Sequence, residues 1–204
     1  MSKYLKRSKI HIKGSRVPLP AIGFESLANL KVPKIFLNQI RNLDYDTMTP
    51  VQSQSIPVLL EDRNCVCIAP TGSGKTVSFV LPILTKLFLE KTKKKGPCKA
   101  VIFAPTFELS AQIYKVILQF IGKLGKVKGL VSNHICRMNL DSLEEFKKEM
   151  NEIDLLVTTP LNFLKILEKD PNNTISKEIK WVVLDEADKY FEMGFLDQFE
   201  KIIS

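Results

Sequence analysis

Short hydrophobic runs alternate along the chain with longer segments whose apolar residues recur at helical spacing. Each run is continuous, which is typical of strands buried on both faces of a parallel sheet. Strands separated by helices indicate βαβ units. The pattern therefore predicts an α/β fold with a mostly parallel sheet and helices on both faces. Its strands are expected at Cys65 to Ala69, Ala100 to Ala104, Gly129 to Val131, Asp154 to Thr158 and Trp181 to Leu184.

Helical periodicity is clearest between Glu108 and Ile121. The apolar positions there are Leu109, Ile113, Val116, Ile117 and Phe120. A second helix is predicted from Asp141 to Met150, because it begins with a capping residue. The helix expected after Thr76 contains Pro82, which predicts a kink because proline removes a backbone hydrogen bond.

A glycine-rich loop, Ala69-Pro70-Thr71-Gly72-Ser73-Gly74-Lys75-Thr76, follows the first strand candidate. Small residues let backbone N–H groups curl around phosphate oxygens, and a helix starting near Lys75 adds its positive end. Lys75 would reach the terminal phosphates and the Thr76 hydroxyl would bind Mg2+. A glycine-rich turn without a ligand is the plainer alternative. The loop predicts a nucleoside triphosphate site formed by Thr71, Gly72, Ser73, Gly74, Lys75 and Thr76.

An acidic motif, Asp185-Glu186-Ala187-Asp188, follows the last strand candidate. The Asp185 carboxylate would leave the sheet at the edge where α/β proteins bind ligands, and it would hold the Mg2+ through water. Glu186 would orient or deprotonate the attacking water. The alternative is a solvated helix start, since acidic residues favour first turns. Lys75, Asp185 and Glu186 are the candidate catalytic residues.

The two motifs resemble those of DEAD-box RNA helicases, and the resemblance covers residues 24 to about 200. The loop has the helicase form Ala-x-Thr-Gly-x-Gly-Lys-Thr, and Thr49-Pro50-Val51-Gln52 resembles the end of the Q motif. The resemblance implies the first RecA-like lobe, with ATP as cofactor. It also implies that Gln52 reads adenine through its amide donor and acceptor, and that Phe24 stacks on adenine. Core packing is the alternative for Phe24.

The RNA-facing motifs depart from the family. Pro105-Thr106-Phe107-Glu108-Leu109 has Phe107 where the family has Arg, and Asn162 replaces the Arg of a Thr-Pro-Gly-Arg motif. The family's Gly-Gly element is not visible near Val131 to His134. Losing two Arg–phosphate contacts predicts weaker RNA binding with less salt dependence. The remaining RNA-facing candidates are Pro105, Thr106, Thr159 and Pro160.

Composition predicts one sizeable core, because the chain has 204 residues of which 45% are apolar. The longest apolar runs are far below the ~20 residues of a membrane span, and the N-terminus lacks a signal-peptide core. The chain is therefore expected to be neither secreted nor membrane-bound. Cys65 and Cys67 are expected to face the same side of the sheet as small core residues. Cys98 and Cys136 stand alone, and neither histidine completes a metal-ligand spacing.

The formal charge of +8 is unevenly distributed. Residues 1–20 contain six basic and no acidic side chains, which predicts a basic, partly disordered arm that touches RNA electrostatically. A second run, from Lys91 to Lys95, is expected to be a solvated surface loop. The domains are therefore predicted as an arm, 1–20, and a first RecA-like lobe, 21–204.

The lobe is expected to be incomplete. By resemblance, the family's Ser-Ala-Thr motif and whole second lobe are missing, and that lobe supplies an arginine finger worth about 10³–10⁵ in turnover in related enzymes. The chain is thus expected to bind ATP weakly and to turn over negligibly. The parent would be an ATP-dependent RNA helicase. Residues 9–14 resemble the branch acting on small-ribosomal-subunit precursors. This resemblance implies a role in ribosome biogenesis, a nucleolar location and pre-ribosomal protein partners. The protein is expected to be a monomer.

Two other functions remain open. Phe107 and Asn162 would also suit a helicase-like scaffold that binds ATP or RNA without unwinding. A P-loop ATPase that does not act on nucleic acid is the second alternative, and the Gln52 adenine clamp argues against it.

Overall fold

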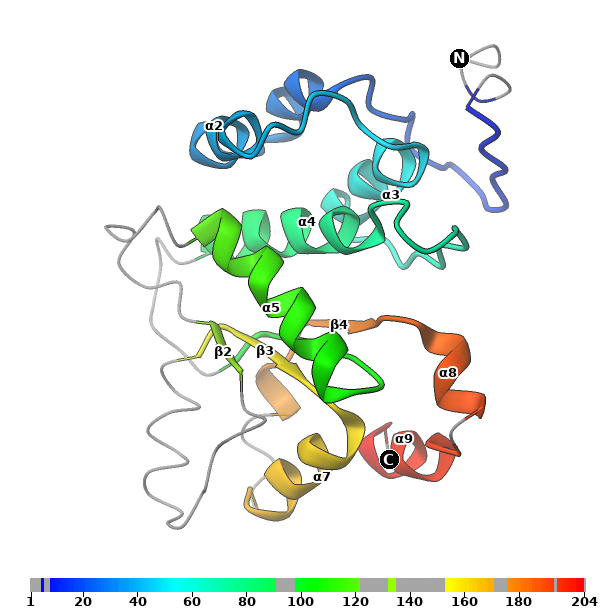
Figure 1. The fold of residues 1–204 in the computed structure, drawn as a ribbon, viewed down its shortest axis with the longest axis vertical. Helices are drawn as coiled ribbons and strands as arrows, with labels where there is room; N and C mark the ends of the chain where they lie inside the picture. Colours follow the sequence, from blue (N-terminus) through cyan, green and yellow to red (C-terminus); the bar gives the residue numbers. More distant parts are fainter. Residues whose placement is uncertain are drawn as a thin grey trace. The chain divides into compact units, whose positions relative to one another are not determined.

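The computed structural model describes residues 5, 8–90, 98–121, 132–134, 153–170, 176–192 and 194–203. These residues form two compact units, the first ending at Leu89 and the second beginning at Glu90 (Figure 1). Three predicted segments lie outside the described residues: the strand Gly129 to Val131, the helix Asp141 to Met150 and the lysine run from Lys91.

The described part of the first unit is helical. Its elements are η1 (Phe24–Leu30), α2 (Lys34–Asn42), α3 (Pro50–Leu60) and α4 (Lys75–Glu90). The Thr49 side chain begins α3 by accepting from the Gln52 N–H, and Pro50 occupies the first turn, where its missing N–H costs nothing. Helix α4 is buried from Val77 to Leu84 and contains Pro82, where the kink stays a prediction. It supplies the centre of this unit's core, with Leu27, Phe36, Ile40, Ile56, Leu81 and Leu84 all fully buried.

The predicted strand from Cys65 to Ala69 is not formed. Residues 63–70 have no regular structure, and the side chains of Val66 and Ile68 are 92% and 98% exposed. A strand needs a neighbour to satisfy its backbone N–H and C=O groups. No described residue of the first unit belongs to a strand. The expectation that Cys65 and Cys67 are core residues is wrong for the same reason, since both are exposed.

A parallel sheet organises the second unit, as predicted. Its strands are β1 (Ala100–Phe103), β2 (Ser132–His134), β3 (Leu155–Thr158) and β4 (Trp181–Leu184). They lie in the order β2-β3-β1-β4, and every pairing is parallel. All residues of β1 and β3 are buried, as their continuous apolar sequences predicted. Strand β4 differs, because Val182 and Leu184 are exposed where burial on both faces was expected. The exposed residues alternate with half-buried ones, so the exposure is confined to one face of the strand.

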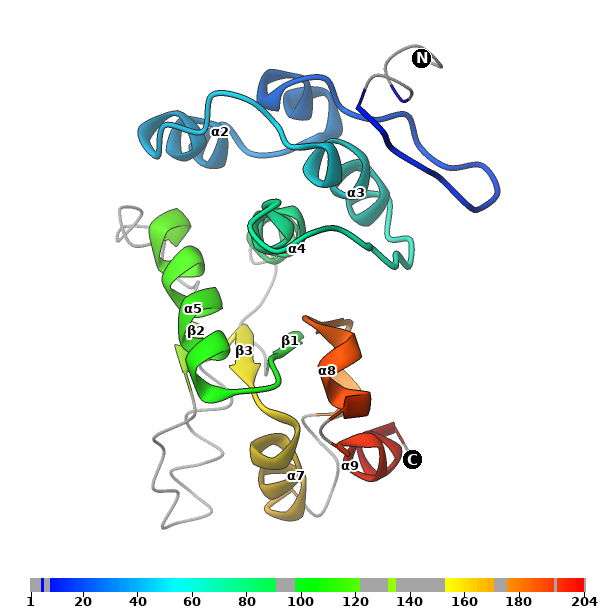
Figure 2. The same ribbon diagram turned by 45° about the vertical axis from the view of Figure 1, so that its right-hand side comes forward.

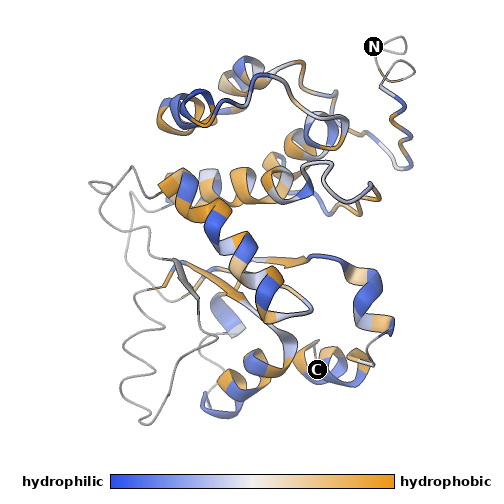
Figure 3. Ribbon diagram, viewed as in Figure 1, coloured by the Kyte–Doolittle hydropathy of each residue, from blue (hydrophilic) through white to orange (hydrophobic). Residues whose placement is uncertain are grey.

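Helices pack on strands β2, β3 and β1 of this sheet. Helix α5 (Phe107–Ile121) contacts β2 and β3 and confirms the predicted helix. Helices α7 (Pro160–Glu168) and α9 (Leu196–Ile203) lie side by side (Figures 1 and 2). The Phe103 ring makes edge contacts with Phe163 at 5.2 Å and Phe199 at 5.4 Å between centroids. Figure 3 shows hydrophobic (orange) residues on β3 and β4, and both hydrophobic and hydrophilic (blue) residues along α5. The remaining elements are η4 (Ser176–Glu178) and α8 (Ala187–Glu192).

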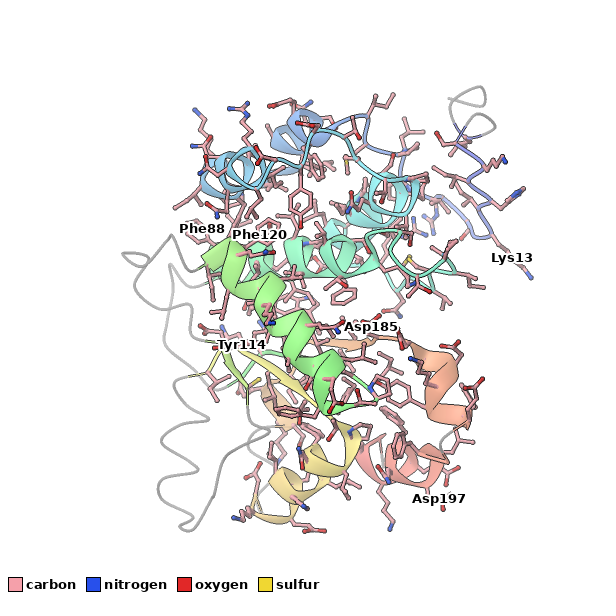
Figure 4. The ribbon with its side chains drawn as sticks, in the orientation of Figure 1. Lys13, Phe88, Tyr114, Phe120, Asp185 and Asp197 are labelled. Carbon is pink, nitrogen blue, oxygen red and sulfur yellow. The ribbon has the colours of Figure 1, made fainter. Side chains whose placement is uncertain are left out.

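The start of the chain, where it is described, contacts the first unit. Arg63 donates to the carbonyl oxygens of Ser15, at 2.6 Å, and Arg16. Gln54 Nε2 donates to the Pro18 carbonyl at 3.0 Å. The backbone of the predicted arm is therefore held at residues 15–18. Lys13 is one of its basic side chains (Figure 4). Among the described residues, no helix has both the length and the apolar content required to cross a membrane.

Candidate functional site

The glycine-rich loop adopts a backbone that only glycine enters easily. Gly72 has φ 75° and Gly74 has φ 86°, and α4 begins at Lys75 as predicted. Both values lie in the left-handed region, where a Cβ is disfavoured. The loop therefore leads directly into a helix N-terminus, which is a favourable position for binding phosphate.

The side chains of the loop are placed at and around this helix start. Lys75 Nζ donates to the Ala69 and Pro70 carbonyl oxygens at 2.6 and 3.0 Å. Thr76 lies in the first turn of α4, and Thr71 is exposed. The Ser73 hydroxyl is buried and has no hydrogen-bond partner among the described residues. An anion with several oxygens could accept hydrogen bonds from both groups. It would give the Ser73 hydroxyl a partner and would replace the two carbonyl partners of Lys75.

Gln52 joins α3 to the phosphate loop. Its Oε1 accepts from the Thr49 N–H at 3.0 Å, and its Nε2 donates to the Gly74 carbonyl at 3.2 Å. The side chain is buried, and a Cβ added at Gly74 would meet Gln52 Nε2 at 2.5 Å. Gln52 thus packs directly against the loop, a contact that the sequence motif alone did not indicate. Reading adenine, which stays a prediction, would require the amide to exchange these two partners.

Phe24 lies in the core of the same unit. Its ring is 6% exposed and lies 6.3 Å from the Tyr45 ring, at an interplanar angle of 47°. The segment before it is attached to α3, where the Ala21 N–H donates to the Ser53 carbonyl at 2.8 Å and the Ser53 hydroxyl donates to the Ala21 carbonyl. Core packing accounts for these contacts. Stacking of Phe24 on adenine stays a prediction.

Asp185 and Glu186 follow β4 directly, and Asp185 is labelled at that point in Figure 4. The Asp185 N–H donates to the Phe103 carbonyl at 3.0 Å, which continues the β1–β4 ladder by one residue. Glu186 has φ 50°, a left-handed conformation that is uncommon for a residue with a side chain. Its N–H donates to Asp185 Oδ1 at 3.1 Å, and its carboxylate pairs with Lys189. The sharp turn places two carboxylates where the strand ends.

Tyr190 is a neighbour of the acidic pair that sequence reasoning missed. It is the only buried residue of α8, and its hydroxyl has no hydrogen-bond partner among the described residues. Burial raises the pKa of its phenol above the ordinary value, and the Asp185 and Glu186 carboxylates raise it further. No spacing rule marked Tyr190 in advance, because α8 begins at Ala187, after the left-handed Glu186.

The four RNA-facing candidates share one edge of the sheet. Phe103 of β1 pairs with Thr158 of β3, so the segments that follow both strands leave the sheet together. These segments contain Pro105 and Thr106 after β1, and Thr159 and Pro160 after β3. Thr106 Oγ1 accepts from the Leu109 N–H at 3.3 Å, and Thr159 and Pro160 begin α7.

The two residues that replace arginine lie at the same edge. Phe107 begins α5 and is 37% exposed, and Asn162 is half-buried in the first turn of α7. The carboxyl edge of the sheet is therefore exposed to solvent at neutral side chains, where the family resemblance implies arginine. Its RNA contacts stay a prediction.

Oxygen-bearing side chains of the two motifs are the candidates for holding a hard cation. The described residues contain no cluster of three or more His, Cys, Asp or Glu side chains that could hold a metal by themselves. The Thr76 hydroxyl in the first unit and the Asp185 carboxylate in the second each offer an oxygen of the kind that Mg2+ prefers. That both bind one ion stays a prediction. The residues present fit this group.

Comparison with known proteins agrees with these motifs. The family described as DEAD/DEAH box helicase matches residues 49–204. The chain belongs to this family. It is 35% identical over 203 residues to the probable ATP-dependent RNA helicase DDX52 of Bos taurus, covering 98% of this chain and 33% of that protein. The ATP-dependent RNA helicase ROK1 of Yarrowia lipolytica is 33% identical over 205 residues, covering 98% of this chain and 37% of that protein.

The fold agrees as well. The crystal structure of the yeast DEAD-box splicing factor Prp28 matches with a TM-score of 0.82 and 31% identity, covering 98% of this chain and 46% of that one. This DEAD-box chain therefore has the RecA-like fold that the motifs predicted. It spans about a third of the length of the two curated relatives.

Proposed function

We propose that this chain is the ATP-binding lobe of an ATP-dependent RNA helicase. The observation that carries the proposal is the phosphate loop, in which two left-handed glycines lead into α4 and Gln52 packs against Gly74. Membership of the DEAD/DEAH box family and the names of the relatives support it.

The loop residues would bind the triphosphate. Backbone N–H groups from Thr71 to Thr76 would surround the phosphates, and Lys75 Nζ would leave the carbonyls it now contacts to reach the terminal phosphates. The charge of Lys75 makes this exchange favourable, because a charge-assisted bond to phosphate is stronger than one to a neutral carbonyl. Gln52 would recognise adenine, with Phe24 stacked on the base.

Asp185 and Glu186 would act on the bound nucleotide. Thr76 and Asp185 would hold Mg2+, Asp185 partly through water, and the ion would neutralise charge that develops on the phosphates. Glu186 would orient the attacking water and accept its proton. Its left-handed backbone and its contact with Lys189 hold the carboxylate close to the end of β4.

RNA would contact the carboxyl edge of the sheet, at Pro105, Thr106, Thr159 and Pro160. Because Phe107 and Asn162 carry no charge, fewer phosphates would be neutralised and the salt dependence of binding would be shallow. In the whole protein, ATP and RNA would close two lobes on one strand and release a short duplex. We further propose that the whole protein acts on ribosomal precursors and binds pre-ribosomal proteins. It would be a monomer inside the cell, in the nucleolus.

A scaffold that binds ATP or RNA without unwinding is the second candidate. The neutral Phe107 and Asn162 at the carboxyl edge favour it over a full helicase. A P-loop ATPase without a nucleic-acid partner is disfavoured by the family match.

Calorimetric titration of the chain with ATP and with GTP, each with Mg2+, tests the proposal. We expect ATP to bind and GTP not to, and Gln52→Glu to weaken ATP binding because it keeps the acceptor for Thr49 but removes the donor. Lys75→Ala should abolish binding, and Lys34→Ala, which changes an exposed lysine of α2, serves as the matched control. A folded chain that binds neither nucleotide would overturn the ATP-lobe proposal.

A further inference from the structure

Two large apolar side chains are exposed at the carboxyl edge of the sheet. Phe107 begins α5 and is 37% exposed, and Leu161, in the first turn of α7, is 52% exposed. Strands β1 and β3 pair in parallel up to Phe103 and Thr158, so the helices that follow them start from the same edge (Figure 1). All four residues belong to the second unit. Apolar surface is therefore exposed at the place of the proposed RNA contact.

Positive charge is absent from the two segments that form this edge. Residues 104–112 contain one charged side chain, Glu108, and residues 158–164 contain none. Glu108 is exposed and negative, so it repels a phosphate instead of binding it. The charge-assisted part of phosphate binding, which arginine or lysine would supply, is therefore missing from these side chains.

An exposed phenyl ring at such an edge suits a nucleobase. Proteins that bind single-stranded RNA stack unpaired bases on aromatic side chains, and every base has a π-face that a ring can cover. Bases inside a duplex are already stacked on their neighbours, so a ring at a protein surface selects single strands. Stacking removes apolar area from water and is not screened by salt, unlike a contact between charges.

The first turn of α5 fixes the backbone that carries this ring. The Ser110 hydroxyl donates to the Phe107 carbonyl at 2.7 Å, and the Ser110 N–H donates to the Thr106 carbonyl at 3.1 Å. Thr106 Oγ1 accepts from the Leu109 N–H at 3.3 Å. A ring on an ordered helix start loses less conformational entropy on binding than one on a mobile loop.

We propose that the Phe107 ring stacks on a base of single-stranded RNA, where the family resemblance implies an arginine–phosphate contact. The proposal rests on the proposed function, because it takes the carboxyl edge as an RNA site, and it names the part of the RNA that this site binds. Binding at Phe107 depends on the presence of a base and little on salt. An arginine at this position would respond to salt and ignore the base.

Fluorescence anisotropy with the whole chain and a labelled oligouridylate of about ten nucleotides tests the proposal. Uridine is chosen because adenine is also the expected ligand of Gln52. The second probe is a ribose-phosphate oligomer of equal length without bases. We expect Phe107→Ala to weaken binding of the oligouridylate by about 5- to 100-fold, the loss expected for one stacked base, and to leave binding of the abasic probe unchanged.

Three further variants separate stacking from other effects. Phe107→Tyr keeps the ring and should retain binding of the oligouridylate. Phe107→Arg should tighten binding of the abasic probe and steepen the dependence of log Kd on log salt by about 0.7, the value for one added phosphate contact on a single strand. Leu118→Ala is the matched control, because Leu118 is 41% exposed on the same helix and far along it from Phe107. It should bind both probes as the wild type does.

Photo-cross-linking locates the base directly. Oligouridylate that contains 5-bromouridine is irradiated on the chain, and cleavage after Lys99 and Lys115 releases residues 100–115, which include Phe107. We expect the nucleotide mass on this peptide, at Phe107, and its loss in Phe107→Ala.

Two results would overturn the stacking proposal and leave the proposed function intact. One is that Phe107→Ala binds the oligouridylate as tightly as the wild type does. The other is that it loses affinity equally for the two probes. If the chain, folded by its urea transition, bound neither probe, the RNA contact and the stack would both be wrong. The calorimetric titration with ATP reports on the nucleotide site separately.

Discussion

Two apolar runs of four residues, Cys65 to Ile68 and Trp181 to Leu184, precede the two nucleotide motifs, yet only the second forms a strand. Trp181 to Leu184 pairs with β1 along its whole length, from Ala100↔Trp181 to Phe103↔Leu184. Cys65 to Ile68 has no strand partner among the described residues of its unit, and Val66 and Ile68 are exposed to solvent. Two apolar runs of equal length therefore differ in structure, because a strand is stabilised by its neighbours as well as by its own residues.

The largest expected loss of stability comes from a substitution in the sheet, next to the run that forms a strand. Phe103→Ala should lower the free energy of unfolding by about 3–5 kcal/mol, because it removes a buried ring and leaves a cavity. Phe103 contacts Phe163 and Phe199 and pairs in register with Leu184. Urea unfolding followed by fluorescence of Trp181, the only tryptophan, measures the change in the second unit. A loss below about 1 kcal/mol would contradict the packing described here, since such a value is typical of surface positions.

Two glycines test whether Gln52 holds the loop that follows the unpaired run. Gly72→Ala should cost about 1–2 kcal/mol, because its φ of 75° is strained for alanine and nothing else lies within 4 Å. Gly74→Ala should cost about 1–3 kcal/mol more, because its Cβ would also collide with Gln52 Nε2. Paired urea titrations monitored by far-ultraviolet circular dichroism give the difference. Equal losses for the two variants would show that Gln52 moves aside freely.

Tyr190→Phe sharpens the description of the acidic pair at the end of β4. Removing a buried hydroxyl without a described partner should raise stability by up to about 1 kcal/mol at neutral pH. Burial and then the two carboxylates raise the phenol pKa in the folded chain, so titration leaves the free energy of unfolding unchanged below about pH 10 and lowers it as the pH rises above that value.

The alkaline arm of the same experiment has its own expected sign. Between about pH 10 and 11 the wild type should lose up to about 1.4 kcal/mol per pH unit relative to Tyr190→Phe. Parallel slopes for the two proteins in urea titrations would show that Tyr190 ionises as readily folded as unfolded. Tyr114→Phe, on α5, serves as the matched control for the general loss of a phenol.

Local signals in the sequence were sufficient wherever the structure uses local interactions. The start of α4 at Lys75, helix α5 and the strands β1 and β3 followed from glycine spacing and hydrophobic periodicity. Non-local contacts were not accessible in this way. The Gln52 contact with Gly74 joins residues 22 positions apart, and nothing in either motif specifies which partner the amide selects. Exposure of Cys65 could not be predicted either, because pairing with another strand is a non-local property and no described strand pairs with residues 65–68.

The smallest expected effect tests the unpaired run directly. Ile68→Ser should change stability by no more than about 0.5 kcal/mol, because an isoleucine that is 98% exposed loses little when it becomes polar. Ile102→Ser, at a fully buried position of β1, is the matched substitution and should be severely destabilising. If Ile68→Ser instead cost several kcal/mol in the same urea titrations, residues 65–68 would have to be buried in solution. Residues 65–68 would then form a strand, as residues 181–184 do, and the two runs would differ only in which strands they pair with.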